Sequence, residues 1–161
     1  MIVALFGTSP HRFDRLMNAL DSLADSIDET IFVQAGHTPI PSGRLKGVGF
    51  LHPAELDQKI QGASLVISQG GFGSMADVLR AGVPLIAIPR LAVLGEAKGD
   101  QDVLVQALEE KGALTAVHDL ELLPDAIESA RMRPTMMLPP STIPDEIARV
   151  VEGWLGGACS G

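Results

Sequence analysis

Short apolar runs alternate with segments of helical periodicity along most of this chain. The runs are rich in β-branched and aliphatic residues, and they predict strands at 1–6, 30–35, 48–51, 65–69, 84–89 and 114–117. Apolar residues that recur every three or four positions, such as Leu16, Leu20 and Leu23, predict helices at 10–26, 53–61, 101–111 and 120–131. A further helix is predicted to follow the glycine turn after residue 69 and to end near residue 81. Strands that are apolar throughout are typical of a parallel sheet covered on both faces. The pattern therefore predicts an α/β fold, a Rossmann-like three-layer α/β/α arrangement with a roughly six-stranded parallel sheet.

Capping residues predict where several of these helices begin and end. Ser9 is a good N-cap with Pro10 as the first helical residue, Gly82 is a good C-cap, and Asp100 can cap the helix that starts at Gln101. Ligands of such sheets bind outside the carboxyl ends of the strands, where the strand order reverses. The loops at 7–10, 69–74 and 89–101 are therefore expected to meet at one crevice.

The last thirty residues differ in composition from the rest. We expect residues 1–131 to form one domain, 132–143 to be a linker rich in proline and methionine, and 156–161 to be a frayed tail. Residues 144–155 predict a C-terminal helix whose apolar face includes Trp154. This helix is expected to pack on the same domain, although docking on a partner stays open.

Composition limits the class of function. The 161 residues are 46% hydrophobic and 20% charged, which is typical of a globular domain, and the formal charge of −8 argues against nucleic acid as the main partner. The single cysteine, Cys159, cannot form an internal disulfide, and no stretch is long and apolar enough for a signal peptide or a membrane span. We therefore expect a cytoplasmic protein that a partner recruits to the inner face of the membrane if it works there.

A glycine-rich turn between an apolar strand and a helix, at residues 68–74, is the strongest chemical signal. Glycines let a ligand approach the backbone, and the first amides of a helix have no intrahelical partner, so this turn predicts a phosphate site. A tight turn without a ligand is the alternative, because Ser74 and Asp77 also fit a capping box.

Other signatures are absent or ambiguous. The turn after the first strand has one glycine, which argues against a dinucleotide site, and neither a P-loop nor a nucleophile elbow is found. His11 and His37 follow the first two strands, so either is a candidate general base. Asp-x-Asp at 100–102 can hold a divalent ion in some enzymes, but a helix start explains Asp100 as well, and we predict no metal site and no cofactor. Arg90 follows a strand end, where it would pair with a phosphate or a substrate carboxylate or be a solvated loop residue. Glu96 in the same loop is a further candidate for substrate binding, with a position facing solvent as the alternative.

Several ordered motifs over about residues 1–125 resemble one known family. They are Leu5-Phe6-Gly7-Thr8 with Phe13-Asp14-Arg15-Leu16, Gln34-Ala35-Gly36-His37, Ser68-Gln69-Gly70-Gly71-Phe72-Gly73-Ser74, Pro89-Arg90, Gly95-Glu96 and Gly99-Asp100-Gln101. The chain resembles small glycosyltransferase family 28 C-terminal-domain proteins of the Alg13/PssE-like type, which are related to MurG. The resemblance implies the donor-binding half of a GT-B glycosyltransferase, with a UDP-sugar as donor substrate.

The resemblance also assigns roles. Gly71, Gly73 and Ser74 would contact the diphosphate, with Gly7 and Thr8 on the same side, and Gln69 could donate a hydrogen bond to it. Asp77 would bind ribose hydroxyls, Phe50 and Leu51 would receive uracil, and Asp100 and Gln101 would read sugar hydroxyls.

One departure from the family pattern affects the expected chemistry. Gln69 stands where the family has histidine, and an amide can donate a hydrogen bond but cannot carry positive charge. The leading interpretation is a catalytic subunit that acts on a lipid-linked acceptor in exopolysaccharide or oligosaccharide synthesis, with glucuronate among several possible donor sugars. A membrane-anchored Alg14/PssD-like subunit would bind the acceptor and supply the base, unless His11 does. A non-catalytic nucleotide-sugar-binding subunit and an unrelated phosphate-binding enzyme stay open as alternatives.

Overall fold

The computed structural model describes residues 1–99 and 101–135. Asp100 and the predicted helix at 144–155 lie outside the described residues, as do the tail at 156–161 and all but the first few residues of the predicted linker. None of the helices within the described residues combines the length and the apolar character needed to cross a membrane.

Six parallel strands form one sheet, as the sequence predicts. They are β1 (Ile2–Leu5), β2 (Ile31–Gln34), β3 (Lys46–Val48), β4 (Leu65–Gln69), β5 (Leu85–Ile88) and β6 (Thr115–Ala116). Their order is β3-β2-β1-β4-β5-β6, and all neighbours run parallel. The chain starts at the middle of the sheet, builds outward to β3 and then returns to β4 beside β1. The order therefore reverses between β1 and β4, and a crevice is expected at their carboxyl ends.

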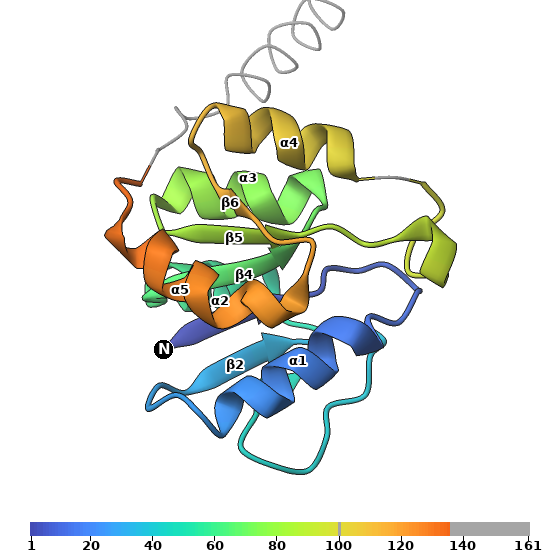
Figure 1. Cartoon of the computed structure of the whole chain (residues 1–161). Helices are drawn as coiled ribbons and strands as arrows, with labels where there is room; N and C mark the ends of the chain where they lie inside the picture. Colours follow the sequence, from blue (N-terminus) through green and yellow to red (C-terminus); the bar gives the residue numbers. More distant parts are fainter. Residues whose placement is uncertain (100, 136–161) are drawn as a thin grey trace, which may run out of the picture.

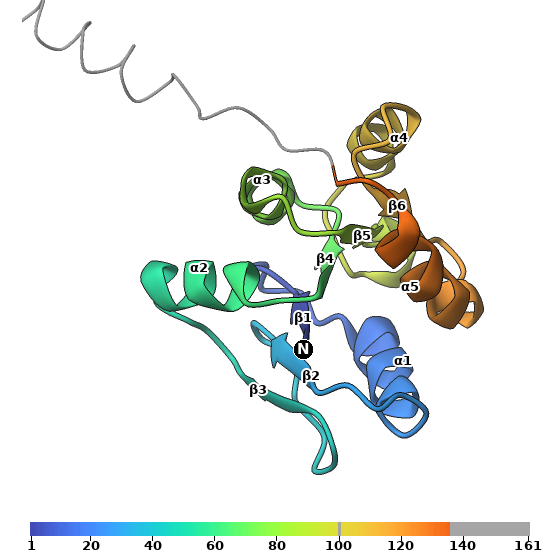
Figure 2. The same ribbon diagram turned by 90° about the vertical axis from the view of Figure 1, so that its left-hand side faces the viewer.

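Helices cover both faces of the sheet, which confirms the three-layer prediction. The helices α1 (Asp14–Ala24) and α5 (Leu123–Met132) lie on one face, and α2 (Pro53–Gln61), α3 (Phe72–Ala81) and α4 (Asp102–Glu110) lie on the other (Figures 1 and 2). Two short 3₁₀ helices, η1 (Ala92–Leu94) and η2 (Leu120–Leu122), interrupt the loops before α4 and α5. Successive residues of a strand point to opposite faces of the sheet and so belong to two hydrophobic cores: Ile2 and Ala4 pack with α1, while Val3 and Leu5 pack with α3.

The prediction for the start of the first helix is wrong. Neither Ser9 nor Pro10 begins it, because α1 starts at Asp14 after Phe13. Phe13 is fully buried, its ring packs edge-on against Phe6 at 5.5 Å, and its N–H donates to the Thr38 hydroxyl at 2.9 Å. These contacts hold residues 7–12 as an irregular loop over the carboxyl edge of the sheet.

Three further boundaries differ from the prediction. The helix predicted to start at Gln101 with Asp100 as its cap begins at Asp102, with Gln101 as its N-cap. The third strand ends at Val48, so Phe50 and Leu51 lie in the loop beyond it. The helix after the glycine turn begins at Phe72 with Gly71 as N-cap, so Ser74 and Asp77 do not form a capping box. Gly82 ends this helix in the left-handed conformation, with φ of 66°, as predicted.

Two valines of α4 provide a matched test of the core. Val105 is fully buried and Val103 is 78% exposed. We expect Val105→Ala to lower the free energy of unfolding by about 2 kcal/mol, because it removes buried methyl groups and leaves a cavity. Val103→Ala is expected to leave stability unchanged or raise it slightly, because alanine favours the helix. Urea denaturation of both variants measures the difference, and equal stabilities would contradict the packing of α4.

Candidate functional site

A hollow of about 230 Å³ lies at the carboxyl edge of the sheet, at the point where the strand order reverses. Its lining comes from residues that end or follow four strands, together with one residue of α2 and two of the first turn of α3. The lining residues are Gly7, Thr8, Gln34, Phe50, Leu51, Leu56, Gln69, Gly71, Gly73 and Ser74. The loops at 7–10 and 69–74 therefore meet there as predicted, whereas no residue of 89–99 lines the hollow.

The first turn of α3 forms one wall. Gly71 precedes the helix, and Gly73 and Ser74 belong to its first turn. The first amides of a helix have no intrahelical acceptor and lie at the positive end of the helix dipole. An added β-carbon at Gly73 would meet no heavy atom of another described part of the chain within 4 Å, so no described side chain fills the space beside this residue. The wall therefore offers hydrogen-bond donors and room for an anionic group.

Gln34 fixes the opposite wall. Its side chain accepts from the Gly7 N–H at 3.1 Å and donates to the carbonyls of Gly7 at 3.1 Å and Gly49 at 2.9 Å. Gly7 has φ of +68°, and a β-carbon there would come within 1.9 Å of the Gln69 amide nitrogen. Glycine at position 7 is therefore required both by the backbone and by the side chain packed against it.

Gln69 ends β4 and reaches the hollow with only 7% of its surface exposed. Its Oε1 accepts a hydrogen bond from Nε of Arg90. A guanidinium only donates hydrogen bonds, so the oxygen of the amide must face Arg90 and the NH₂ group must face the other way.

Arg90 does not line the hollow. It is 2% exposed, and besides Gln69 it donates to the carbonyls of Phe6 at 2.9 Å, His11 at 3.0 Å, Arg12 at 3.2 Å and Glu96 at 3.1 Å. Its guanidinium also lies 4.5 Å from the centre of the Phe13 ring. Burial lowers the pKa of Arg90, and the Glu96 charge opposes that shift. The expected roles of Arg90 are a ligand for substrate anions or a solvated loop residue. The structure instead shows a buried side chain that anchors the loops after β1 and β5 to each other and to Gln69.

Glu96 is buried at 5% exposure, which corrects the expectation that it faces solvent. Its carboxylate accepts two hydrogen bonds from Arg15, at 3.2 and 3.1 Å, and one from the Leu91 N–H at 2.9 Å. Arg15 also donates to the Pro89 carbonyl at 3.0 Å. These bonds hold the loop after β5 against α1. They explain why no residue of 89–99 lines the hollow.

The far end of the hollow is apolar. Phe50 is 52% exposed, and its ring packs edge-on against the exposed His37 at 5.2 Å. Leu51 and Leu56 complete this end. The hollow thus joins an apolar end to a wall of amide donors.

The remaining predicted residues lie outside the hollow. Asp77 is one turn further along α3, bonded to Arg80 at 2.8 Å, and lines a separate hollow between α2 and α3. Gln101 accepts from the Arg90 N–H at 3.3 Å and packs on Gly70. His11 does not line the hollow, and its Nε2 is buried without a hydrogen-bond partner among the described residues. Asp100 lies outside the described residues.

Gln34 belongs to a motif of the family resemblance, but sequence reasoning gave it no role in the site, and Leu56 carried no signal. The ten lining residues include no Asp, Glu, His, Lys or Arg. Over residues 1–99 and 101–135, no three His, Cys, Asp or Glu side chains come together as a metal site would need.

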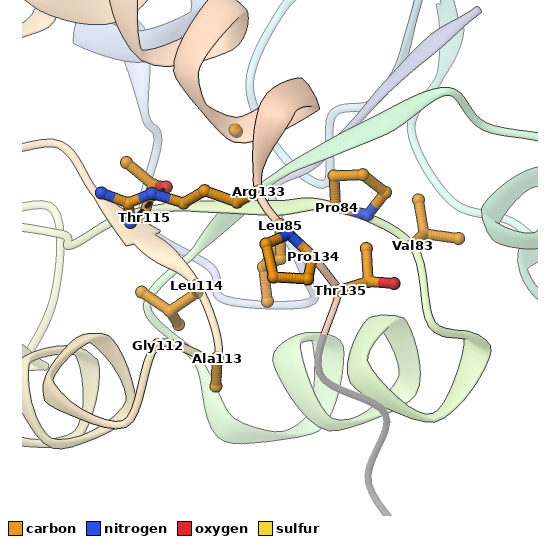
Figure 3. A pocket seen from close by; sticks show the side chains of 11 residues that line it. Val83, Pro84, Leu85, Gly112, Ala113, Leu114, Thr115, Arg133, Pro134 and Thr135 are labelled. Carbon is orange, nitrogen blue, oxygen red and sulfur yellow. Dashed lines mark hydrogen bonds between the residues drawn. The ribbon is translucent and has the colours of Figure 1, made fainter.

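Two other hollows have different characters. One, at the amino-terminal edge of β5 and β6, has a volume of about 20 Å³ and is lined in part by Arg133, Pro134 and Thr135 (Figure 3). The other lies between α1 and η2, has a volume of about 360 Å³ and is lined largely by apolar residues such as Leu23 and Leu120. The first has room for little more than a water molecule.

Arg90→Lys tests the anchor. Lysine keeps the charge but offers three donors without the planar fork, so we expect a loss of about 2 to 4 kcal/mol in the free energy of unfolding. Arg12→Lys is the control, because Arg12 is exposed and bonds only Asp14 through its side chain. Urea denaturation measures both, and equal stability of the two variants would contradict the anchoring role.

Comparison with known proteins supports the fold and gives the family. Solved structures with the same fold include the glycotransferase of kitacinnamycin (TM-score 0.64, 15% identity, 81% of this chain and 35% of that chain) and MurG of Acinetobacter baumannii (TM-score 0.59, 16% identity, 93% and 49%). The glycosyltransferase VinC in complex with DTDP also matches (TM-score 0.56, 16% identity, 82% and 33%). The chain thus spans between a third and a half of each of these proteins. The family model for the glycosyltransferase family 28 C-terminal domain matches residues 24–139, and the chain belongs to this family.

Proposed function

We propose that this chain binds the nucleoside diphosphate of a UDP-sugar in the hollow at the carboxyl edge of the sheet. One observation carries the proposal: the hollow joins the free amides of the α3 N-terminus to the apolar residues Phe50 and Leu51. A diphosphate needs donors that tolerate two negative charges, and a base needs an apolar surface on which to stack. The hollow meets both needs within one connected space.

The ligand would lie with its diphosphate against Gly71, Gly73 and Ser74 and its uracil against Phe50. The DTDP in the VinC complex supports a nucleoside diphosphate as the class of ligand, because that protein has the same fold. Asp77 and Gln101 would take part in binding ribose and sugar only if the ligand extends beyond the hollow, since neither lines it.

The reaction that we propose is transfer of the sugar to a lipid-linked acceptor in exopolysaccharide or oligosaccharide synthesis. A bond forms between an acceptor oxygen and the anomeric carbon, the bond from that carbon to the diphosphate breaks, and the acceptor proton passes to a base. Amides at the α3 N-terminus would stabilise the charge that grows on the departing diphosphate. The sugar stays open among glucuronate, N-acetylglucosamine, glucose and galactose. Pairing of Arg90 with the carboxylate of glucuronate would favour that sugar, but the Arg90 side chain is engaged within the protein.

None of the described residues that line the hollow titrates near neutral pH, so none of them can act as the base of this reaction. We propose that a membrane-anchored Alg14/PssD-like subunit provides the acceptor site and the base, and that such a partner recruits the chain to the membrane. The same observation favours a second candidate, a nucleotide-sugar-binding subunit without catalysis. Transfer from a UDP-sugar by the reconstituted pair, lost when the hollow of this chain is blocked, distinguishes the first candidate from the second.

Calorimetric titration with UDP, paired with substitutions at Gly73, tests the binding proposal. Gly73→Ala and Gly73→Leu introduce side chains into space that no side chain of the described residues occupies. We expect wild type to bind UDP, Gly73→Ala to bind it less tightly, and Gly73→Leu to bind it least. Gly73→Ala should also raise the free energy of unfolding by up to about 1 kcal/mol, because alanine favours the helix over glycine. UDP binding that is unaffected by Gly73→Leu would place the ligand elsewhere, and no binding by wild type would contradict the proposal.

Two exposed phenylalanines test the position of the base. Phe50 lines the hollow, whereas Phe72, 67% exposed at the start of α3, does not. Loss of a stacking surface costs about 1 to 3 kcal/mol, so Phe50→Ala should weaken UDP binding about 5- to 150-fold. Phe72→Ala should stay within about twofold of wild type, because its ring lies outside the hollow. If the two variants bind UDP equally, the base does not lie on Phe50.

A further inference from the structure

We propose that Arg90 is a positioning residue that turns the amide of Gln69 so that its NH₂ group is a fixed, neutral donor to the diphosphate. This inference rests on the proposed function for the identity of the ligand. At the position where the family has histidine, this chain would then have an uncharged hydrogen-bond donor, Gln69, whose amide oxygen is held by the buried cation of Arg90.

The orientation of the amide follows from the chemistry of its neighbour. Nε of Arg90 donates to Oε1 of Gln69, and a guanidinium has no atom that could accept from the NH₂ group. Nε2 therefore faces Gly7 and Gly71, the residues at which an added β-carbon would lie 1.9 and 3.2 Å from it. Both glycines line the hollow, as does Gln69 itself.

Arg90 is held too firmly to turn with the amide. Its guanidinium donates to four backbone carbonyls at 2.9 to 3.2 Å, lies 4.5 Å from the centre of the Phe13 ring and is 2% exposed. Rotating Gln69 by half a turn would set its NH₂ group against a cation that can only donate. The arrangement is therefore fixed before a ligand arrives, which avoids the cost of ordering the donor on binding.

Nε2 of Gln69 has no hydrogen-bond acceptor among the described residues. The residue as a whole is only 7% exposed. Among the described residues, the buried side-chain polar atoms without a partner are His11 Nε2 and Asp102 Oδ1, so Gln69 Nε2 is not sealed inside the protein but opens to the hollow, where a ligand can accept from it. The first amides of α3 form the adjoining wall, and together they suit an anion such as a phosphate. The positive charge of Arg90 polarises the amide in the same sense, since it lies on the oxygen side.

Gln69→Glu is the decisive variant, because it keeps an acceptor for Arg90 and replaces the donor by a negative oxygen. We expect its thermal stability to equal or exceed that of wild type. We expect its affinity for UDP, and for inorganic pyrophosphate, to fall by about 10- to 150-fold or more, the loss of a charge-assisted hydrogen bond. Gln106→Glu, the same change at an exposed position of α4, should leave both affinities unchanged. Gln69→His should restore binding to within about tenfold of wild type, because a neutral imidazole can accept from Arg90 and donate on its other side.

A direct readout accompanies the titrations. The side-chain NH₂ signals of Gln69, identified as those absent from ¹⁵N spectra of Gln69→Glu, should shift when pyrophosphate is added to wild type. UDP binding that Gln69→Glu leaves intact, with unmoved NH₂ signals, would overturn this inference while the proposed function stands. Pyrophosphate binding through Gln69 without UDP binding would overturn the proposed function alone, and failure of wild type to bind either probe would overturn both.

Discussion

Burial of the Arg90 guanidinium holds the carboxyl edge of the sheet together. The loop after β1 supplies three carbonyls to it, β4 supplies the Gln69 amide, and the loop after β5 supplies the carbonyl of Glu96. A buried charge needs such a complete set of partners, because each unpaired group would cost desolvation energy. The irregular course of residues 7–12 follows from this need, since a helix there would use the carbonyls of His11 and Arg12 for its own hydrogen bonds.

The candidate site would bind an anion without a charged group among its described lining residues. With a formal charge of −8, the chain as a whole repels anionic ligands, and the lining of the hollow adds no cation. Donors must therefore come from local dipoles: the first amides of α3 and the NH₂ group of Gln69, with Arg90 behind it. Gly73 leaves space beside these donors, and Gln34 holds the Gly7 turn at a fixed distance from them.

Sequence patterns predict the fold better than the site. Apolar runs such as the one in β4 predict the six strands of the described residues, because most of those strands are buried on both faces. Helical spacing such as Leu16-Leu20-Leu23 predicts their five α-helices, because each helix buries one apolar stripe. Helix starts are harder, since Ser9 and Pro10 suit an N-cap locally but the buried Phe13 and its bond to Thr38 decide the outcome. The glycine turn and Phe50 line the same hollow. The burial of Arg90 and Glu96 depends on contacts between residues over seventy positions apart, which spacing along the chain does not reveal.

A crystal structure of the chain with UDP would show whether a nucleoside diphosphate binds in the hollow at the carboxyl edge. We expect the diphosphate within hydrogen-bond distance of the first amides of α3 and of Gln69 Nε2, with the uracil against Phe50 and the Arg90 side chain unmoved. UDP bound away from the hollow at the carboxyl edge, or a hollow that stays free of UDP at saturating concentration, would contradict this expectation.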